Sequence, residues 1–241
     1  MLYCARFSEM KKSFLILACL FFASSGAFAQ RGLENLPHYN DRRWHFGFLL
    51  GFNFYDFHIQ EIENLSSVPG YYSVRSTVNP GYNINIIANL KLARYLDLRF
   101  LPGFASSNRV LTFDVLSPES GERVEVPREI ITSAIEFPLE FRYRSKRINN
   151  FGMYVLGGAK YNKDLASKED SEDDQIFKIA SNDMFYEFGF GLDFYFEYFK
   201  FSPQIKASFG FADILVPDGT FLVEGIHRLE TRSILICLTF E

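Results

Sequence analysis

The sequence has few cysteines and almost no long apolar run, and each of these two shortages excludes a class of protein. Its 241 residues include 3 cysteines, 1 tryptophan and 9 prolines. The only continuous apolar stretch, SFLILACLFFASSGAF, lies near the start. No later segment has the roughly 20 consecutive apolar residues that a transmembrane helix needs. The pattern therefore excludes a helical membrane protein.

The early apolar stretch has the features of an export signal. Lys11 and Lys12 precede it, and the small-x-small sequence AFA ends at Ala29. A basic region, a short apolar region and a small-residue cleavage site together define a secretory signal peptide. We therefore predict that residues 1–29 are a signal peptide, with Met10 as an alternative start.

The mature chain lacks both basic excess and paired thiols. Removing residues 1–29 takes away 3 of the 25 basic and 1 of the 29 acidic residues, which leaves 22 and 28 and a formal charge of −6. This balance argues against a nucleic-acid partner. Cys237 is then the only thiol, which excludes an internal disulfide and a cysteine-based metal cluster. We predict no cofactor.

Aromatic residues are abundant, with 28 Phe and 13 Tyr, and the run FYEFGFGLDFYFEY at 185–198 shows how they are arranged. One parity is wholly apolar and consists of Tyr186, Phe188, Phe190, Leu192, Phe194 and Phe196. The other parity consists of Glu187, Gly189, Gly191, Asp193, Tyr195 and Glu197. A period of two indicates a strand. Lipid outside and a polar lumen inside explain both faces, and about eleven residues cross a bilayer when tilted.

The same alternation predicts eight strands and a regular rhythm of connections. The expected strands are 44–54, 82–92, 96–104, 131–144, 151–161, 185–198, 201–211 and 233–240. Long connections at 56–79, 105–129, 162–183 and 213–225 alternate with short ones at 93–94, 145–150 and 199–200. Long outer loops and short periplasmic turns are typical of outer-membrane barrels, whereas a soluble β-sandwich, the alternative, does not require them.

We therefore predict an all-β fold, an eight-stranded antiparallel transmembrane outer-membrane β-barrel over 44–241, with both termini periplasmic. Residues 30–43 are expected to form a periplasmic lead-in, and 110–116 could extend a strand above the membrane. Pro138 lacks a ladder donor and predicts a bulge or local fraying. The ending LTFE resembles the assembly signal of outer-membrane barrels, which implies the barrel assembly machinery and outer-membrane lipid as partners.

Charged side chains on the lumen parity predict an internal network. They are Asp97, Arg99, Glu136, Glu140, Arg142, Glu187 and Asp193. Buried charges must pair because an isolated buried ion is costly, and we expect Arg142 to pair with Glu140, the preceding inward residue. An eight-stranded barrel is only wide enough for its own side chains, so the geometry argues against a general diffusion pore. A structural plug is the favoured interpretation, and a proton or ligand relay is the alternative.

Catalytic and metal-binding chemistry has little support. His58 and His227 lie near the outer ends of the first and last predicted strands, with Asp56 and Glu224 close in sequence, so an acid/base pair is conceivable. No nucleophile motif accompanies them. The acidic run EDSEDD at 169–174 lacks the glycine and spacing of a calcium loop. We predict no enzyme activity, no catalytic residue and no metal site.

Three stretches of the chain resemble the PorT-like family of outer-membrane proteins found in Bacteroidetes. They are NLPHYNDRRWHFGFLLGFNFYDF (35–57), IEFPLEFRYRSKRINNFGMYVLGGAKYNKDLASKED (135–170), and KFSPQIKASFGFADIL (200–215) with the ending RSILICLTFE (232–241). The resemblance implies a non-enzymatic barrel required for protein export by the type IX secretion system, and for delivery of adhesins where gliding motility is present.

A narrow barrel must serve export by contact with other type IX components. The lead-in faces the periplasm in this interpretation, and Leu36, Pro37, Asp41 and Arg42 are the predicted contact residues. An outer-membrane barrel enzyme and a ligand-binding or adhesion barrel remain alternatives.

Overall fold

The computed structural model describes residues 34–62, 70–117, 121–167, 178–217 and 221–241. The chain divides into two units, Met1–Glu34 and Asn35–Glu241. Only Glu34 of the first unit is described, so the predicted signal peptide lies outside the described residues, as do residues 30–33 of the lead-in and the acidic run 169–174. All the elements below belong to the second unit.

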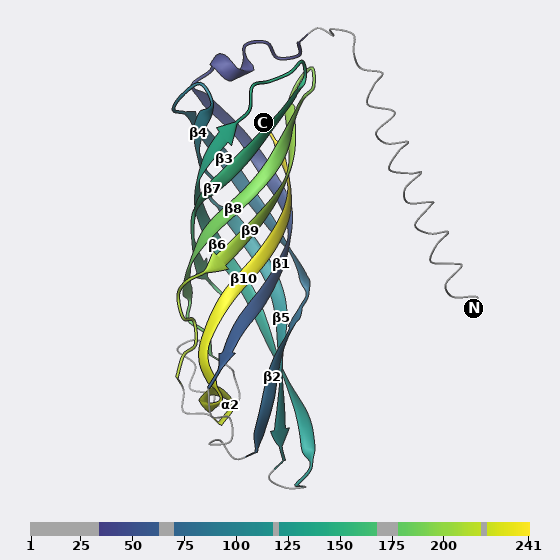
Figure 1. Ribbon diagram of the computed structural model, residues 1–241, viewed down its shortest axis with the longest axis vertical. Coiled ribbons are helices and arrows are strands. Elements are labelled where there is room, and N and C mark those ends of the chain that lie inside the picture. Colours follow the sequence, from purple (N-terminus) through teal and green to yellow (C-terminus); the bar gives the residue numbers. More distant parts are fainter. Residues whose placement is uncertain (1–33, 63–69, 118–120, 168–177, 218–220) are drawn as a thin grey trace, which may run out of the picture. The chain divides into compact units, whose positions relative to one another are not determined.

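The second unit is a sheet closed into a barrel (Figure 1). Its elements are η2 (Tyr39–Asp41), β1 (Trp44–Glu61), β2 (Tyr71–Val78), β3 (Pro80–Lys91), β4 (Leu96–Phe100), β5 (Gly103–Leu116), β6 (Arg123–Arg144), β7 (Phe151–Asp164), β8 (Asn182–Tyr195), β9 (Lys200–Gly210), α2 (Phe221–Glu224) and β10 (Ile226–Phe240). No helix within the described residues has the length and hydropathy of a membrane span.

The predicted eight-stranded antiparallel ring is confirmed, although ten strands are present. The hydrogen-bonded order is β1-β10-β9-β8-β7-β6-β4-β3-β5-β2, and a further pairing of β1 with β3 closes the ring. β4 and β5 both pair with β3 and with β6, so they are two halves of one strand interrupted at Leu101 and Pro102. β2 pairs with β5 and prolongs the line of β3 beyond the ring.

Several strands are longer than predicted, and two of the expected long loops are mostly sheet. β1 continues to Glu61, β5 and β6 leave only 117–122 between them, and β10 begins at Ile226 instead of 233. At this end of the barrel the inward side chains are apolar, including Phe57, Leu111 and Phe113. The period of two continues there with inverted polarity, since Leu111 and Phe113 are buried while Thr112 and Asp114 between them face outward. A search for strands with an apolar outer face therefore ends them too early.

The end of the barrel that holds the short connections is called the turn end, and the opposite end the loop end. At the turn end β8 stops at Tyr195, so the turn is 196–199 and the predicted strand to 198 is too long. At the loop end β2, β5 and β6 project past the ring as a three-stranded sheet, seen at the bottom of Figure 1. An apolar core that includes Phe57, Phe113 and Leu229 fills this end.

Pro138 causes no bulge, but the ladder on one side of it is interrupted, as the alternative of local fraying predicts. Pro138 lies opposite Lys160 in an unshifted register with β7, and its carbonyl accepts a hydrogen bond from the backbone N–H of Leu101 at 3.0 Å. The irregularity falls instead on the facing strand, between Phe100 and Gly103. A proline without an N–H is tolerated where the neighbouring ladder is already interrupted.

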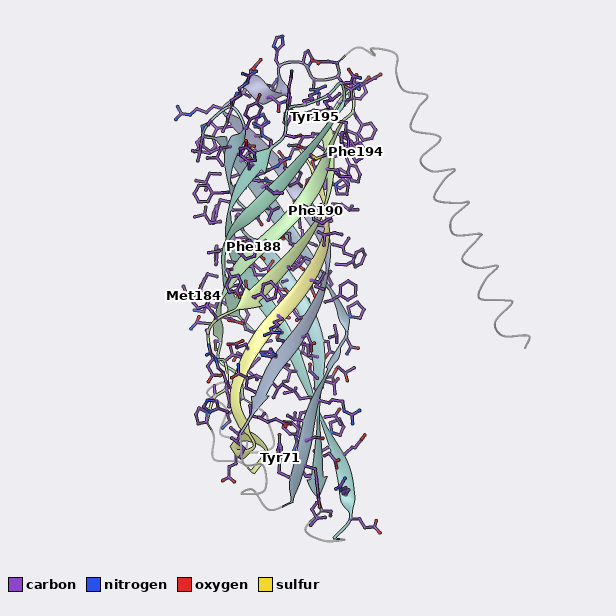
Figure 2. All side chains as sticks on the ribbon, viewed as in Figure 1. Tyr71, Met184, Phe188, Phe190, Phe194 and Tyr195 are labelled. Atoms are coloured by element: carbon purple, nitrogen blue, oxygen red, sulfur yellow. The ribbon has the colours of Figure 1, made fainter. Side chains whose placement is uncertain are left out.

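The outer wall of the ring is apolar and the interior is polar. Phe188 and Phe190 of β8 are each 57% exposed, whereas Glu187 between β7 and β9 is fully buried (Figure 2). Exceptions to the alternation, Leu49, Ile87 and Leu235, point inward and form one buried apolar cluster with Leu101 and Cys237. An apolar outer wall with buried inner charges suits a barrel that has lipid as its solvent.

Candidate functional site

The interior of the barrel contains all seven charged residues that alternation placed on the lumen parity. Each is at most 2% exposed. The structure adds five buried charged side chains to the ion-pair network, namely Arg144, Lys160, Lys200, Lys206 and Glu241, while a sixth buried charge, Arg109, lies outside it. Arg144 and Lys206 stand on the inward parity and could have been found. Lys160 was obscured because the two faces of β7 are poorly separated in sequence, and Lys200 and Glu241 lie outside the predicted strands.

Glu241 is the centre of the charge cluster at the turn end. Its carboxylate accepts hydrogen bonds from Arg99 NH2 at 2.6 Å, from Lys200 Nζ at 2.9 Å and from the Tyr39 hydroxyl at 2.9 Å. Arg142 NH1 lies 3.8 Å from the same carboxylate. Four groups from distant parts of the chain therefore neutralise one buried anion, in line with the cost of leaving it unpaired.

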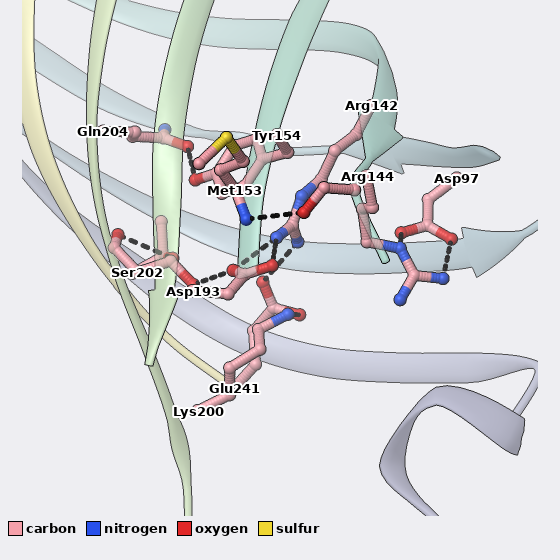
Figure 3. A network of polar contacts seen from close by, with 12 residues as sticks. Asp97, Arg142, Arg144, Met153, Tyr154, Asp193, Lys200, Ser202, Gln204 and Glu241 are labelled. Atoms are coloured by element: carbon pink, nitrogen blue, oxygen red, sulfur yellow. Dashed lines mark hydrogen bonds and ion pairs between the residues drawn. The ribbon is translucent and has the colours of Figure 1, made fainter. Parts of the chain in front are cut away.

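Arg142 pairs with Asp193 of β8 and not with Glu140, so the predicted partner is wrong (Figure 3). Ser202 donates to the same Asp193 carboxylate at 2.6 Å, and the Arg142 guanidinium lies 3.7 Å from the centre of the Tyr154 ring. Glu140 and Arg142 are two apart on β6, so they share a face but stand about 7 Å apart. Tyr154 of β7 and Asp193 of β8 approach Arg142 more closely. Closure of the barrel, which no local pattern contains, decides the pairing.

Asp97 forms a two-point ion pair with Arg144. Arg144 Nε lies 2.7 Å from Asp97 Oδ2, and Arg144 NH2 donates to Oδ1 at 3.0 Å. The third nitrogen, NH1, donates to Asn40 Oδ1 of the lead-in at 2.6 Å. This fork geometry satisfies a carboxylate and an amide at once, which a lysine could not do.

A second cluster fills the middle of the barrel. Lys160 Nζ lies 3.3 Å from Glu136 and 3.2 Å from Glu187, and Lys206 Nζ lies 2.7 Å from Glu140 and 3.4 Å from Glu187. Hydroxyl and amide groups complete the shell, since Ser208 donates to Glu187 at 2.5 Å and Asn83 to Glu136 at 2.6 Å, while the Tyr55 hydroxyl lies between Lys160 and Glu136.

The two clusters balance in charge. At the turn end four cationic side chains (Arg99, Arg142, Arg144, Lys200) meet three anionic ones (Asp97, Asp193, Glu241). In the middle, Lys160 and Lys206 meet three carboxylates, Glu136, Glu140 and Glu187. Four plus two cations against three plus three anions leaves no net charge. The two clusters together are therefore neutral, without the uniform sign of an ion pathway, and the buried Arg109 lies outside them.

The lead-in closes the turn end of the barrel, which the sequence did not predict. Asn35 donates through its backbone to Asn150 Oδ1 at 2.8 Å and through its side chain to the Tyr195 carbonyl at 3.0 Å. Lys91 Nζ donates to the Asn40 carbonyl at 2.5 Å, and the Tyr39 ring stacks on His45 at 4.2 Å. Burial raises the pKa of the Tyr39 phenol, and the neighbouring Glu241 carboxylate raises it further.

The four residues predicted to contact a partner behave differently from one another. Pro37, Asp41 and Arg42 are exposed, whereas Leu36 is half-buried in a left-handed conformation with φ 49°. Leu36 therefore contributes to the closure, because its carbonyl accepts from Arg147 NH1 at 3.3 Å and from the backbone N–H of Tyr39 at 3.0 Å. The other three form the free surface of the lead-in.

A small cavity lies between the middle cluster and the apolar core of the loop end. It has a volume of about 40 Å³ and is lined by Arg109, Asp164 and Asp183 among others. Arg109 is 3% exposed, donates to Thr132 Oγ1 at 2.8 Å and lies 3.9 Å from the centre of the Phe57 ring, but its Nε and NH1 have no hydrogen-bond partner among the described residues. The space suits a few water molecules bridging these charges, not an organic ligand.

The two histidines considered as an acid/base pair lie in different surroundings. His58 lies opposite Glu230 in the β1–β10 register. His227 and Glu224 line a separate surface hollow with Asp213. A search of the described residues finds no group of three or more His, Cys, Asp or Glu side chains placed to hold a metal.

A closed ring with a lipid-facing apolar wall and a neutralised interior defines the chain as a transmembrane β-barrel. The sequence matches the outer membrane protein beta-barrel domain family over residues 28–216. The chain therefore belongs to this family, and its place is the outer membrane. No curated protein matches the sequence significantly.

Two solved structures illustrate how distant the structural relatives are. Ail, the attachment invasion locus protein of Yersinia pestis, solved with the heparin analogue sucrose octasulfate, shares 11% identity over 83% of this chain and 99% of its own, with a TM-score of 0.38. The N-terminal β-barrel domain of Pseudomonas aeruginosa OprF shares 10% identity over 80% of this chain and 97% of its own, with a TM-score of 0.32.

Proposed function

We propose that this barrel is a non-enzymatic component of the type IX secretion system that acts by contact with other components of the system and not as a pore. The resemblance of three long stretches to the PorT-like family supports the secretion role. The closed interior supports the contact mechanism, and it is the observation on which the proposal depends most. Where gliding motility is present, the same role includes delivery of gliding adhesins.

Conduction is disfavoured at three successive levels of the barrel. The lead-in bonds across the turn end through Asn35, Tyr39 and Asn40. Two charge clusters and the buried Leu49 cluster occupy the lumen, and an apolar core fills the loop end. An exported protein has no path through such an interior, so a contribution to export has to come from a surface.

In the orientation we propose, the turn end faces the periplasm and the loop end faces the outside. Short turns on the periplasmic side and longer segments outside are usual in outer-membrane barrels. The exposed surface of the lead-in, Pro37, Asp41 and Arg42, then faces the compartment from which cargo and most partners approach. Other type IX components are the proposed partners of this surface.

Deletion of the lead-in cannot test this proposal, because the segment also satisfies buried charges. Substitution of its exposed residues can. We expect Asp41→Lys combined with Arg42→Glu, introduced into a strain lacking the wild-type gene, to give a folded outer-membrane barrel but little export of surface proteins. Cell fractionation, heat-modifiable gel migration and blots for type IX cargo are the measurements.

A matched control changes an exposed ion pair at the other end. Arg75 NH2 and Glu125 lie 3.9 Å apart on the projecting sheet, and both are exposed. Exchanging them, Arg75→Glu with Glu125→Arg, should leave export normal. Normal export from the lead-in variant would argue against contact through this surface, and normal export from a complete deletion strain would refute the secretion role itself.

The projecting sheet favours one second candidate, a ligand-binding or adhesion barrel. β2, β5 and β6 extend beyond the ring with exposed Tyr72, Val124 and Ile131 on them. This candidate predicts that shortening the 116–123 connection abolishes attachment of cells while cargo export continues. The secretion proposal instead predicts that a strain lacking the gene loses cargo export.

A further inference from the structure

Three exposed basic side chains on one side of the turn end are together called the basic arc: Arg43, Arg94 and Lys146. The exposed Arg42, next to Arg43, belongs to the lead-in surface described above and is not counted in the arc. The backbone connects their positions. The Lys91 N–H donates to the Arg43 carbonyl at 2.9 Å, and the Arg144 N–H donates to the Tyr95 carbonyl at 2.8 Å. The arc therefore follows the rim from the start of β1, across the β3–β4 turn, to the end of β6.

None of the three side chains is engaged in an ion pair within the described part of the chain. Arg94 lies over the ring of the adjacent Tyr95, with 5.3 Å between its guanidinium carbon and the ring centre. In contrast, Arg147 on the same rim is half-buried and bonded to the carbonyls of Asn35 and Leu36. The cations of the basic arc are therefore available to an anionic ligand, whereas Arg147 is engaged in holding the lead-in over the turn end.

The opposite side of the turn end is different in composition. There the β8–β9 turn 196–199 exposes three aromatic rings and the acid Glu197, and the cation that follows, Lys200, is buried against Glu241. Tyr198 in this turn is 89% exposed. Positive charge is therefore restricted to the β1–β3–β4–β6 side.

The basic arc is continuous with the lipid-facing wall. Trp44 follows Arg43 directly and is 53% exposed, Leu92 is 49% exposed, and Tyr143 on β6 is 59% exposed. Tryptophan and tyrosine gather where a membrane protein meets the headgroup region, because their rings are apolar and their N–H and O–H groups need water. The arc therefore stands at the level of lipid phosphates.

We infer that the basic arc binds anionic phospholipid in the leaflet next to the turn end, with the lipid phosphates held by Arg43, Arg94 and Lys146 and the acyl chains on the wall below. Guanidinium and ammonium groups beside an anionic membrane surface attract acidic headgroups, and phosphate matches the fork of arginine. The inference depends on membrane insertion and not on the secretion role, so the two can fail separately.

Trp44 provides the measurement because it is the only tryptophan in the sequence. The full mature chain is refolded into phosphatidylcholine vesicles that contain an equal small fraction of brominated phosphatidylglycerol or brominated phosphatidylcholine. We expect the anionic brominated lipid to quench Trp44 roughly twofold more strongly at low salt, and the difference to shrink at about 1 M salt, where the Debye length is about 3 Å.

Two triple variants separate lipid binding from net charge. Replacing the arc, Arg43→Gln with Arg94→Gln and Lys146→Gln, should make quenching by the two lipids equal. Replacing three exposed cations of the loop end, Arg75→Gln with Arg123→Gln and Lys163→Gln, removes the same charge and should preserve the difference. Heat-modifiable migration confirms that each variant is folded.

Equal quenching by both brominated lipids in the wild-type protein would overturn the inference and would favour an acidic protein segment as the occupant of the arc. A difference that survives the arc substitutions but disappears in the loop-end variant would also overturn it. Loss of export in the Asp41 and Arg42 variant, tested separately, has no bearing on this result.

Discussion

Arg142 shows at the residue scale how a barrel interior differs from the strands that compose it. Its guanidinium is fully buried, pairs with Asp193, and approaches both Glu241 and the Tyr154 ring. Removing one partner of a buried ion pair leaves the other charge buried without a counter-charge, whereas removing both partners can cost little folding stability. The pair can therefore be tested by a double-mutant cycle.

We expect Arg142→Met to destabilise the barrel by about 3 to 5 kcal/mol, and Arg142→Met with Asp193→Asn to lose less than the sum of the single changes. Urea unfolding of the refolded protein in detergent or lipid is the measurement. Arg142→Met with Glu140→Gln is the control, and its losses should add because these two side chains are not paired. If the stability losses added for Arg142→Met with Asp193→Asn but not for Arg142→Met with Glu140→Gln, the partner of Arg142 would be Glu140 and not Asp193.

Adjacent glycines of β7 provide a second prediction at this scale. A Cβ added to Gly158 would lie 2.2 Å from the Leu139 carbonyl oxygen and 2.7 Å from Glu140 Cα, both backbone atoms. A Cβ on Gly157 would meet its nearest neighbour, a ring carbon of Phe188, at 3.5 Å. We expect Gly158→Ala to cost about 1 to 3 kcal/mol by overpacking and Gly157→Ala to be tolerated. Equal urea midpoints for the two variants would contradict this.

At the scale of the element, β8 has a lipid-facing and a lumen-facing side. Phe190 is 57% exposed and stands in the middle of the strand, between the inward Gly189 and Gly191. We expect Phe190→Arg to cost roughly 2 to 4 kcal/mol, since a charge near the bilayer midplane is most expensive there. Tyr198→Arg, in the turn, should cost far less. An unchanged heat-modifiable transition for Phe190→Arg would mean that β8 is oriented the other way.

The lead-in is an element whose importance comes from the charges it satisfies. Asn40 Oδ1 accepts from Arg144 NH1 at 2.6 Å and from the Tyr195 hydroxyl at 3.2 Å. Asn40→Ala leaves both donors without this acceptor, so we expect a loss of about 1 to 3 kcal/mol. Pro37→Ala, at an exposed position of the same segment, is the control and should unfold at the wild-type urea concentration. A loss confined to Pro37→Ala would show that the closure does not stabilise the barrel.

Sequence patterns predicted the strands of the ring well, but they predicted poorly the strand extensions at the loop end, the ion-pair partners and the contacts of the lead-in. Period-two alternation located β8, β9 and the membrane parts of β1, β3 and β6, because lipid and lumen impose opposite polarity on alternate residues. It ended the strands too early where the polarity of the two faces is inverted, as at Phe57 and Phe113, whose apolar side chains point inward near the loop end. Ion-pair partners such as Lys160 with Glu187, and the bonding of the lead-in, depend on contacts between distant parts of the chain.

At the scale of the whole molecule, the interior is closed more than once. We expect the purified protein to give no channel openings in a planar bilayer, and deletion of residues 35–40 to open none, because the charge clusters and the apolar core of the loop end still fill the lumen. The deletion should instead lower stability. Regular single-channel steps from the wild-type protein would refute a contact mechanism, and steps from the deletion alone would identify the lead-in as a gate.

The sheet that projects beyond the ring has a mechanical consequence. β5 and β6 run without interruption from the barrel wall to the tip and face each other through fourteen register pairs, from Gly103 with Glu136 to Leu116 with Arg123. Because residues 117–122 join the two strands at the tip, tension applied there along the strand direction would pull β5 and β6 the same way and would load them side by side, up to their pairings with β3 and β7 in the ring. A load taken up at the tip would therefore reach the ring through two hydrogen-bonded strands acting together, with little extension of the sheet that transmits it.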